Sequence, residues 1–425
     1  MYGHDAFTEG ELAQPVGGIL VMAEHELEYE INLLRKLVEI NTTVTSDSRM
    51  GYAECSEMIR LEAQRAGLGT EVLDGHDVTI DGESRPNVII SLDGNSEVDL
   101  LLVTHMDVVP ADETEWKTPP FQLRVSGDRA YGRGAADDKS NIIAAMSAMR
   151  ELAKGEPDVN IKLLVTVDEE IGGRAGIGYL FDDLGIRGNA GVVIDSAPNY
   201  VSIGASGALW GRIKIKGEAG HSGYPHRADN AIYRTTAFIE KLKEYHKETS
   251  KKRSKIQAPP ESPFPKVHGR FTITMIQAWE KENIIPGECE IRFDRRLTPE
   301  EDPVIAEKDL CQYMEKIAKS QGTTIEDFKI INSIQGYFTE ETHPFVQHFT
   351  TLVNQVVGKP LPIAADLGGN DGAHLAEVGI PVCCYGTIRE DTNYHAPNEF
   401  VYLKDIQIVR DVLIALGKSP ANKFS

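Results

Sequence analysis

Apolar stretches that alternate with helical stretches are the feature that most limits how this chain can fold. In the first half, three segments have helical spacing and four are continuous apolar runs: helices at 24–42, 52–66 and 140–152, and strands at 86–92, 99–109, 160–167 and 190–195. Strands that are apolar on both faces are typical of a mostly parallel sheet with helices on both sides. The first half therefore predicts an α/β domain.

The pattern changes after residue 205. Alternating strands and amphipathic helices follow in the order strand, helix, strand, strand, helix, at 211–217, 230–248, 269–278, 287–297 and 306–321. The α/β pattern returns near residue 342 and continues to about 415. We therefore expect a catalytic domain made of residues 1–205 and 323–425, with an α+β domain, residues 206–322, inserted into it.

Composition excludes some functions. The length of 425 residues favours two domains, and the net charge of -21 argues against nucleic acid, whose phosphates attract Lys and Arg. The apolar stretch at 15–23 is too short to span a bilayer and lacks a basic lead-in. An odd number of cysteines without metal-ligand spacing predicts reduced thiols in the cytoplasm: Cys55, Cys289, Cys311, Cys383 and Cys384.

Acidic and histidine residues gather where the predicted strands end. They are His105 and Asp107, Asp137 and Asp138, Glu169 and Glu170, Asp195, and later His395 and Glu399. Taken singly, each has an ordinary explanation as a structural histidine, a helix cap or a solvated acidic turn. However, the carboxyl ends of parallel strands line one crevice. Two histidines and several carboxylates there would suit a pair of divalent metals, zinc above all.

The motifs at these positions resemble one family. In order they are HMDVVP, GRGAADDKS, DEEIGG, DSAP, AGHSGYPHRADNAI, NIIPGE followed by DRR, GGNDGAHL and HAPNEF. This set, over about residues 27–415, is similar to the dinuclear zinc amidohydrolases and peptidases, which include acetylornithine deacetylase, succinyl-diaminopimelate desuccinylase, aminoacylase and glutamate carboxypeptidase. The resemblance implies a phosphorylase/hydrolase-like mixed sheet between helices, and a ferredoxin-like inserted domain that acts as lid and dimerisation domain.

The resemblance also implies roles for these residues. His105 and Asp195 would each hold one metal, Glu170 and His395 the other, and Asp137 would bridge the two. Asp107 would orient His105, and Glu169 would be the general base. His221 would stabilise the oxyanion, from its own or a neighbouring subunit. The peptide bond between Asp137 and Asp138 would be cis.

Substrate contacts rest on weaker matches. Arg296 and Asn283 match family positions near the substrate carboxylate, and Arg295 competes with Arg296 because the arginine is doubled. Gly368 and Gly369 would bring backbone groups close to the ligand. The chain departs from the usual pattern at Ser140, His374 and Asp195, and these departures bear on the substrate class.

We therefore expect a hydrolase with two divalent ions, zinc with cobalt or manganese as alternatives, that cleaves an N-acyl amino acid. A dipeptidase or glutamate-type carboxypeptidase with the same site is the alternative. We expect a homodimer formed through the inserted domain, with no nucleic-acid or membrane partner. A non-catalytic binding protein would not need Glu169 or a complete ligand set. A nucleotide-binding protein would need a P-loop, which GRGAADDKS does not provide.

Overall fold

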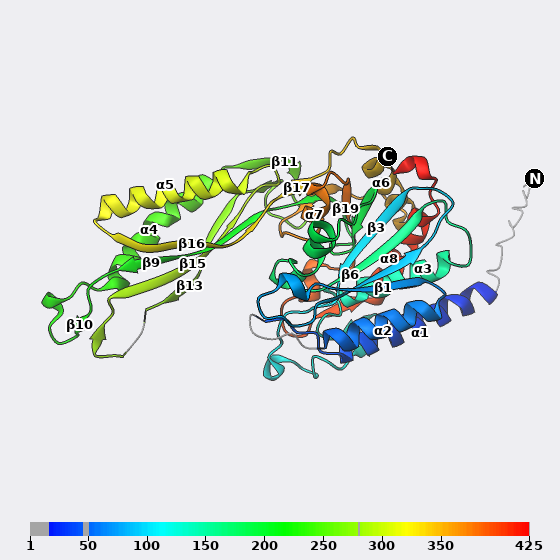
Figure 1. Ribbon diagram of the computed structural model, residues 1–425, viewed down its shortest axis with the longest axis horizontal. Coiled ribbons are helices and arrows are strands. Elements are labelled where there is room, and N and C mark those ends of the chain that lie inside the picture. The colour runs from blue at the N-terminus through cyan, green and yellow to red at the C-terminus, as the bar shows by residue number, and fades with distance from the viewer. Residues whose placement is uncertain (1–16, 46–50, 279–280, 425) are drawn as a thin grey trace, which may run out of the picture.

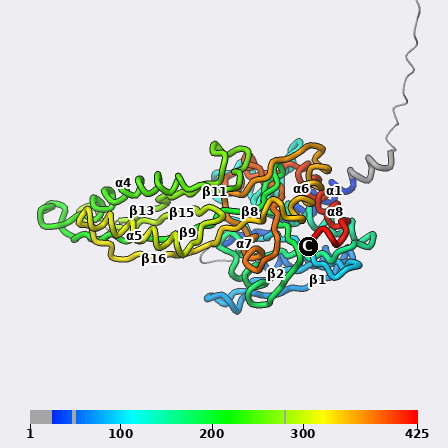
Figure 2. Tube along the Cα trace, turned by 90° about the horizontal axis from the view of Figure 1, so that it is seen from above, coloured from blue at the N-terminus to red at the C-terminus, as the bar shows by residue number. Residues whose placement is uncertain are grey.

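The chain forms two lobes that are joined end to end. The computed structural model describes residues 17–45, 51–278 and 281–424. A larger lobe, which we call the body, contains both ends of the described chain, and a longer, thinner lobe, which we call the arm (residues 208–334), extends away from it (Figures 1 and 2). The start of the apolar stretch at 15–23 lies outside the described residues. Within the described part of the chain, no helix is long and apolar enough to cross a membrane.

The body is built on a nine-stranded mixed sheet. Its strands are β1 (Gly69–Asp74), β2 (Pro86–Leu92), β3 (Asp99–His105), β6 (Asn160–Thr166), β7 (Ala190–Val193), β8 (Val201–Ala205), β17 (Tyr337–Phe338), β18 (Ile363–Asp366) and β19 (Val382–Cys384). The order is β1-β2-β6-β3-β7-β19-β8-β17, with β18 on β8. The central strands β6, β3, β7 and β19 are parallel. A small sheet joins β4 (Arg124–Ser126), β5 (Arg129–Tyr131) and β20 (Phe400–Tyr402).

Helices cover both faces of the nine-stranded sheet, as predicted. One face carries α1 (Gly17–Glu39), α2 (Tyr52–Arg65), α3 (Lys139–Leu152), α6 (Pro344–Val357) and α8 (Leu403–Gly417), and the other carries α7 (Gly372–Glu377). Successive residues of β3 alternate between the two cores, with Leu100 and Leu102 on the first face and Leu101 and Val103 on the second. The α/β prediction is therefore confirmed, and this burial explains the continuous apolar runs.

The arm has the strand-helix-strand-strand-helix-strand order of a ferredoxin-like fold. Its antiparallel sheet has the order β13 (Arg270–Gln277), β15 (Glu288–Arg296), β9 (Ala208–Lys216) and β16 (Thr324–Ile334). Helices α4 (Ala231–Thr249) and α5 (Pro303–Gln321) pack on one face around a core that includes Phe238, Phe271 and Phe293. Two further short strands, β10 (Gly220–His221) and β14 (Ile284–Ile285), pair at its far end.

Two features differ from the predicted domain limits. The arm runs past residue 322, the predicted end of the insert, because β16 pairs with β9 and is the fourth strand of the antiparallel sheet of the arm. Inside the arm sequence, β11 (Arg253–Gln257) and β12 (Lys266–His268) form a hairpin whose buried residues Ile256 and Val267 belong to the core of the body. In packing, this hairpin is therefore part of the body.

The first and the last crossing between body and arm lie side by side. Strands β8 and β17 pair on the body side, and β9 and β16 pair on the arm side. Between them, Gly207 and Gly336 face each other so closely that a Cβ on Gly207 would lie 2.6 Å from the backbone nitrogen of Gly336. Glycine is required there because a side chain would separate the two crossings.

Candidate metal centre

Four segments bring the predicted residues to one edge of the body sheet. His105 is the last residue of β3, and Asp195 follows β7. Glu169 and Glu170 begin a short 3-10 helix just after β6, and Asp137 precedes α3. Because β6, β3 and β7 are parallel neighbours, their carboxyl ends open on the same side.

The Asp137 carboxylate lies between two histidines. Its Oδ1 is 3.1 Å from Nε2 of His105, and its Oδ2 is 3.0 Å from Nε2 of His395. Nε2 of His395 also lies 3.0 Å from the carboxylate of Glu170. One carboxylate thus gives one oxygen to each side of the site.

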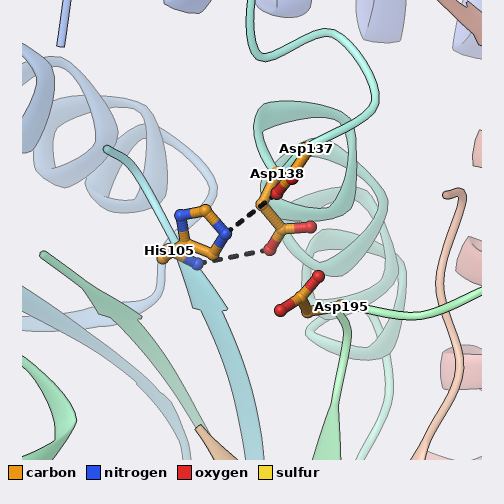
Figure 3. A group of neighbouring side chains, drawn as sticks. All are labelled: His105, Asp137, Asp138 and Asp195. Carbon is orange, nitrogen blue, oxygen red and sulfur yellow. Dashed lines mark hydrogen bonds and ion pairs between the residues drawn. The ribbon is translucent and has the colours of Figure 1, made fainter. Parts of the chain in front are cut away.

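Two groups of potential ligand atoms result. The first contains His105, Asp137, Asp138 and Asp195, and the second contains Asp137, Glu170 and His395; within each group the atoms lie within 4.8 Å of one another. Figure 3 shows the first group, with His105 on its strand, Asp195 just past the end of the neighbouring strand, and Asp137 and Asp138 at the start of the helix. Imidazole nitrogens and carboxylate oxygens at this spacing fit two divalent ions that share Asp137.

Asp138, which the sequence did not select as a ligand, has partners within the protein. Its carboxylate accepts hydrogen bonds from Thr104 Oγ1, from the backbone nitrogen of His105 at 3.2 Å and from Asn141 Nδ2. Burial raises the pKa of Asp138 to about 8. The peptide bond that joins it to Asp137 is cis, as predicted.

Burial and mutual repulsion raise the pKa values of several carboxyl groups in the site. Burial, and then the charge of Asp137, raise the pKa of Glu170 to about 7. Burial, and then Asp138, raise the pKa of Asp195 well above its usual value. Hydrogen bonds to Asp137 and Glu170 raise the pKa of His395 to about 10. Several carboxylates this close together repel one another when they are ionised. Bound divalent cations would offset this repulsion.

Glu169 differs from its neighbour Glu170. Glu170 belongs to the second ligand group, whereas Glu169 belongs to neither and lines the cleft beside them. Burial raises the pKa of Glu169 well above its usual value, and the nearby charges of Asp195 and Asp371 raise it further. A carboxyl group with this perturbation beside a ligand cluster is a candidate acid or base.

Asp107 holds three parts of the site together. Its two carboxylate oxygens accept from the backbone nitrogens of Glu169 at 3.2 Å and Glu170 at 3.1 Å. Its Oδ1 also lies 3.5 Å from Nδ1 of His105. Asp107 therefore lies beside His105, as predicted. It also fixes the backbone that carries Glu169 and Glu170.

Glu399, which the sequence grouped with the acidic residues of the site, belongs to neither ligand group. It is fully buried and accepts from Arg133 Nη1 at 2.6 Å. Its carboxylate also accepts from the backbone nitrogens of Gly134, Ala136 and Asp137 at 2.9–3.1 Å. Glu399 thus holds the loop that presents Asp137.

A cleft of about 1480 Å³ opens from the two ligand groups and is lined by both lobes. The predicted substrate residues Arg296, Gly368 and Gly369 all line it, as does His374. Arg295, the competing arginine, is fully buried and pairs with Glu301 at 2.7 Å. Between the two arginines, the geometry favours Arg296.

His221 and Asn283 lie elsewhere. Both are exposed at the far end of the arm, where the backbone nitrogen of Ser222 donates to the oxygen of Asn283 at 3.0 Å. Neither lines the cleft of its own chain, and Figure 1 shows β10, which carries His221, at the end of the arm away from the body. The structure brings these two residues together but does not bring them to the ligand groups.

Asp366 is a residue that sequence reasoning missed. It lines the cleft at the end of β18, two residues before the glycine pair at 368 and 369. Its carboxylate accepts from Ser196 Oγ at 3.0 Å, Tyr200 Oη at 2.5 Å and Ser202 Oγ at 2.8 Å. These bonds tie the glycine loop to the segment that follows Asp195. The only sequence signal was its position at a strand end.

Comparison with known proteins agrees with this site. The sequence model of peptidase family M20/M25/M40 matches residues 101–418, most of the chain. The chain belongs to peptidase family M20/M25/M40. As a member of this family it is a metal-dependent hydrolase of the metallopeptidase and amidohydrolase type.

Two relatives and one solved structure match between 83% and 95% of the chain. A succinyl-diaminopimelate desuccinylase from Alkalilimnicola ehrlichii is 29% identical over 83% of this chain and 90% of its own length. An uncharacterized metallohydrolase from Methanocaldococcus jannaschii is 26% identical over 92% of this chain and 99% of its own length. The structure of human carnosine dipeptidase 1 matches with a TM-score of 0.77. Its sequence is 17% identical, and the match covers 95% of this chain and 98% of that one.

Proposed function

We propose that this protein is a homodimeric zinc hydrolase that cleaves the amide bond of an N-acyl amino acid. The observation that carries the proposal is the Asp137 carboxylate, whose two oxygens lie 3.1 and 3.0 Å from His105 and His395. A carboxylate placed in this way suits a bridge between two ions.

In this proposal His105 and Asp195 would hold one ion, Glu170 and His395 would hold the other, and Asp137 would be shared. Two such ions would polarise the amide carbonyl as Lewis acids and would lower the pKa of water toward neutrality. Zinc suits the mixed nitrogen and oxygen donors, with cobalt or manganese as alternatives.

Glu169 is the proposed general base. It lines the cleft beside the ligand groups without belonging to them. It takes a proton from the attacking water and returns it to the leaving amine. Asp107 supports this step, because it fixes the backbone nitrogens of Glu169 and Glu170 and orients His105.

The position of His221 supports a dimer. It is the proposed oxyanion-stabilising residue, yet it is exposed at the end of the arm with Asn283 beside it. A second copy of the chain would bring both residues to a site that they do not reach in their own chain. The edge strand β13 exposes Met275 and Ile276, which gives the arm an apolar edge for this contact.

Arg296, Gly368 and Gly369 are the proposed substrate contacts on the cleft wall. The guanidinium of Arg296 would bind the carboxylate of the amino-acid product, and the glycines allow the ligand to approach the backbone. The desuccinylase relative supports an N-acyl amino acid. A dipeptidase is the second candidate, because the cleft of about 1480 Å³ is larger than a small acyl group requires.

The test is a metal analysis combined with a substrate panel. The purified protein is expected to hold close to two ions per chain by elemental analysis. It should hydrolyse at least one member of a panel of N-acetyl and N-succinyl amino acids and dipeptides, and removal of metal by a chelator should abolish this activity until zinc is restored. A protein that binds no stoichiometric metal, or that hydrolyses nothing in the panel, would contradict the proposal.

A further inference from the structure

The tip of the β11–β12 hairpin, residues 258–265, forms part of the cleft wall. Pro259, Glu261, Ser262 and Pro263 line the cleft together with the residues of the ligand groups. The tip is held by Asn199, whose side-chain amide hydrogen-bonds to the carboxylate of Glu261. Asn199 itself lines the cleft, four residues after Asp195 in the sequence.

This tip is rigid and anchored. Four of its residues are proline, at 259, 260, 263 and 265, which restricts the backbone. The backbone nitrogen of Ala258 donates to the oxygen of Pro265 at 3.1 Å, and that of Ser262 donates to Pro259 at 2.9 Å. Both hydrogen bonds join residues of the tip itself, so they stabilise the turn.

The hairpin is fixed to the body. Ile256, Ala258 and Val267 pack into the core of the body, whereas the helices and strands of the arm have a core of their own. At its base, Ser254 Oγ and the backbone nitrogen of Lys255 donate to Glu300, a residue of the arm, at 2.7 and 3.0 Å, and Lys255 Nζ donates to Glu340 of the body at 2.6 Å. The hairpin therefore packs into the body core and is also bonded to the arm at its base.

We infer that the hairpin tip is a fixed wall that limits the length of the substrate. The other walls include Trp210 and Arg296 from the arm, and the ligand groups from the body. A substrate that extends past the scissile bond toward the tip meets proline rings, which restrict the backbone, and the carboxylate of Glu261, which Asn199 holds. This inference rests on the proposed function and makes it more specific: the enzyme acts on single N-acyl amino acids or dipeptides and excludes longer peptides.

The experiment compares substrates of increasing length. The best substrate from the panel is extended by one and by two alanine residues, and the ratio of kcat/KM for the extended to the parent compound is measured. A variant that lacks residues 260–263 retains Ala258 and Pro265, which close the turn. It should raise this ratio about tenfold or more, because the wall is gone. Asn199→Ala, which releases Glu261 without altering the loop, should raise the ratio by a smaller factor.

Phe264→Ala is the matched control. Phe264 belongs to the tip but is exposed and lies outside the cleft lining, where its ring contacts His268 in a tilted arrangement with ring centroids 4.4 Å apart. It should leave the ratio unchanged. If the ratio does not change in the shortened variant, or in Asn199→Ala when the shortened variant fails to fold, the inference is overturned while the proposed function stands. If the wild-type protein hydrolyses none of the panel, both are overturned.

Discussion

Two adjacent glutamates at the end of β6 have different surroundings. Glu170 faces His395 at 3.0 Å, whereas Glu169 lies in the cleft with a pKa raised by burial. Neighbouring side chains of a short 3-10 helix diverge, so one can bind metal while the next faces the substrate. The proposed roles, metal ligand for Glu170 and general base for Glu169, would use this difference, and the two residues can be tested separately.

Glu169→Gln and Glu170→Gln form a matched pair of isosteric changes. Glu169→Gln should keep the metal content but lower kcat by about 100-fold to 10,000-fold, because an amide cannot accept the proton. Glu170→Gln should weaken metal binding at least about tenfold, because an amide is a poorer ligand. Elemental analysis after dialysis and steady-state kinetics would separate the two. A Glu169→Gln enzyme with near wild-type turnover would disprove the base assignment.

Asp107→Asn tests a residue that positions others. The amide keeps one acceptor oxygen, so it cannot accept from both glutamate backbone nitrogens as the carboxylate does. Metal affinity should fall about 10- to 100-fold, which a competition assay with a chromophoric chelator would measure. Asp112→Asn is the control, because Asp112 caps an exposed turn through the backbone nitrogen of Thr114. Equal affinities in the two variants would contradict this role for Asp107.

At the scale of elements, the sequence predicted which strand ends carry the site, because the parallel sheet is apolar on both faces and its polar residues fall where strands end. It did not predict the end of the arm. In β16 the register shifts between Ile325 and Asp327 and again between Ile330 and Asn332, so the alternation of buried and exposed residues is irregular. The sequence also did not predict that the β11–β12 hairpin packs on the body, because the body residues that it contacts are distant in the sequence.

The same limit applies to individual residues of the site. His105 and Asp107 could be predicted because they follow an apolar run, although β3 ends at His105 and Asp107 lies two residues beyond the strand, not on it as the sequence predicted. The bonds from Glu399 to the loop before Asp137, and from Asp366 to Ser196 and Tyr200, join segments that are distant in the sequence. No local pattern carries that information. For His221, the motif identified the residue but did not indicate that the arm holds it away from its own cleft.

The contact between α1 and α8 provides a pH-dependent prediction. Glu30 is fully buried in α1, and its Oε1 lies 2.9 Å from Arg410 Nη1 in α8. Burial raises the pKa of Glu30 from 4.5 to about 7, although Arg410 opposes the shift. The folded protein therefore binds this proton more tightly than the unfolded chain does. The stabilisation that results is complete below pH 4.5 and is lost as the pH rises to about 7.

Glu30→Gln removes this titration. Between about pH 4.5 and 7, the free energy of unfolding of the wild type should fall relative to that of the variant, and urea denaturation at several pH values would measure the difference. Glu28→Gln, at an exposed position on the same helix, is the control for loss of a negative charge. Wild-type and Glu30→Gln curves that stay parallel over this range would contradict the assignment.

At the scale of the whole molecule, the arm holds β10, which carries His221, away from the body and from the site that His221 is proposed to complete (Figure 1). Mixing two inactive variants tests whether it acts across a dimer. In a heterodimer of Glu169→Gln and His221→Ala, one site has both an intact Glu169 and a partner with an intact His221. An equal mixture after subunit exchange should therefore recover about one quarter of wild-type activity.

The control for this mixture is a pair of body variants, Glu169→Gln with Glu170→Gln. Both residues belong to the same cleft, so every site in any heterodimer keeps one defect and no activity should return. A mixture of Glu169→Gln and His221→Ala that stays inactive, although mass spectrometry shows heterodimers, would mean that His221 does not act from the partner subunit.

The touching glycines at the junction have a consequence for how such a protein can change over time. Because Gly207 and Gly336 lie against each other, the chain leaves the body and returns to it at nearly one point. A segment whose two ends meet can be lost, lengthened or exchanged without moving the sheet that it interrupts. The hairpin at 253–268 is the exception, because it is packed into the body core. An ancestor without the arm would have needed another segment to fill that place.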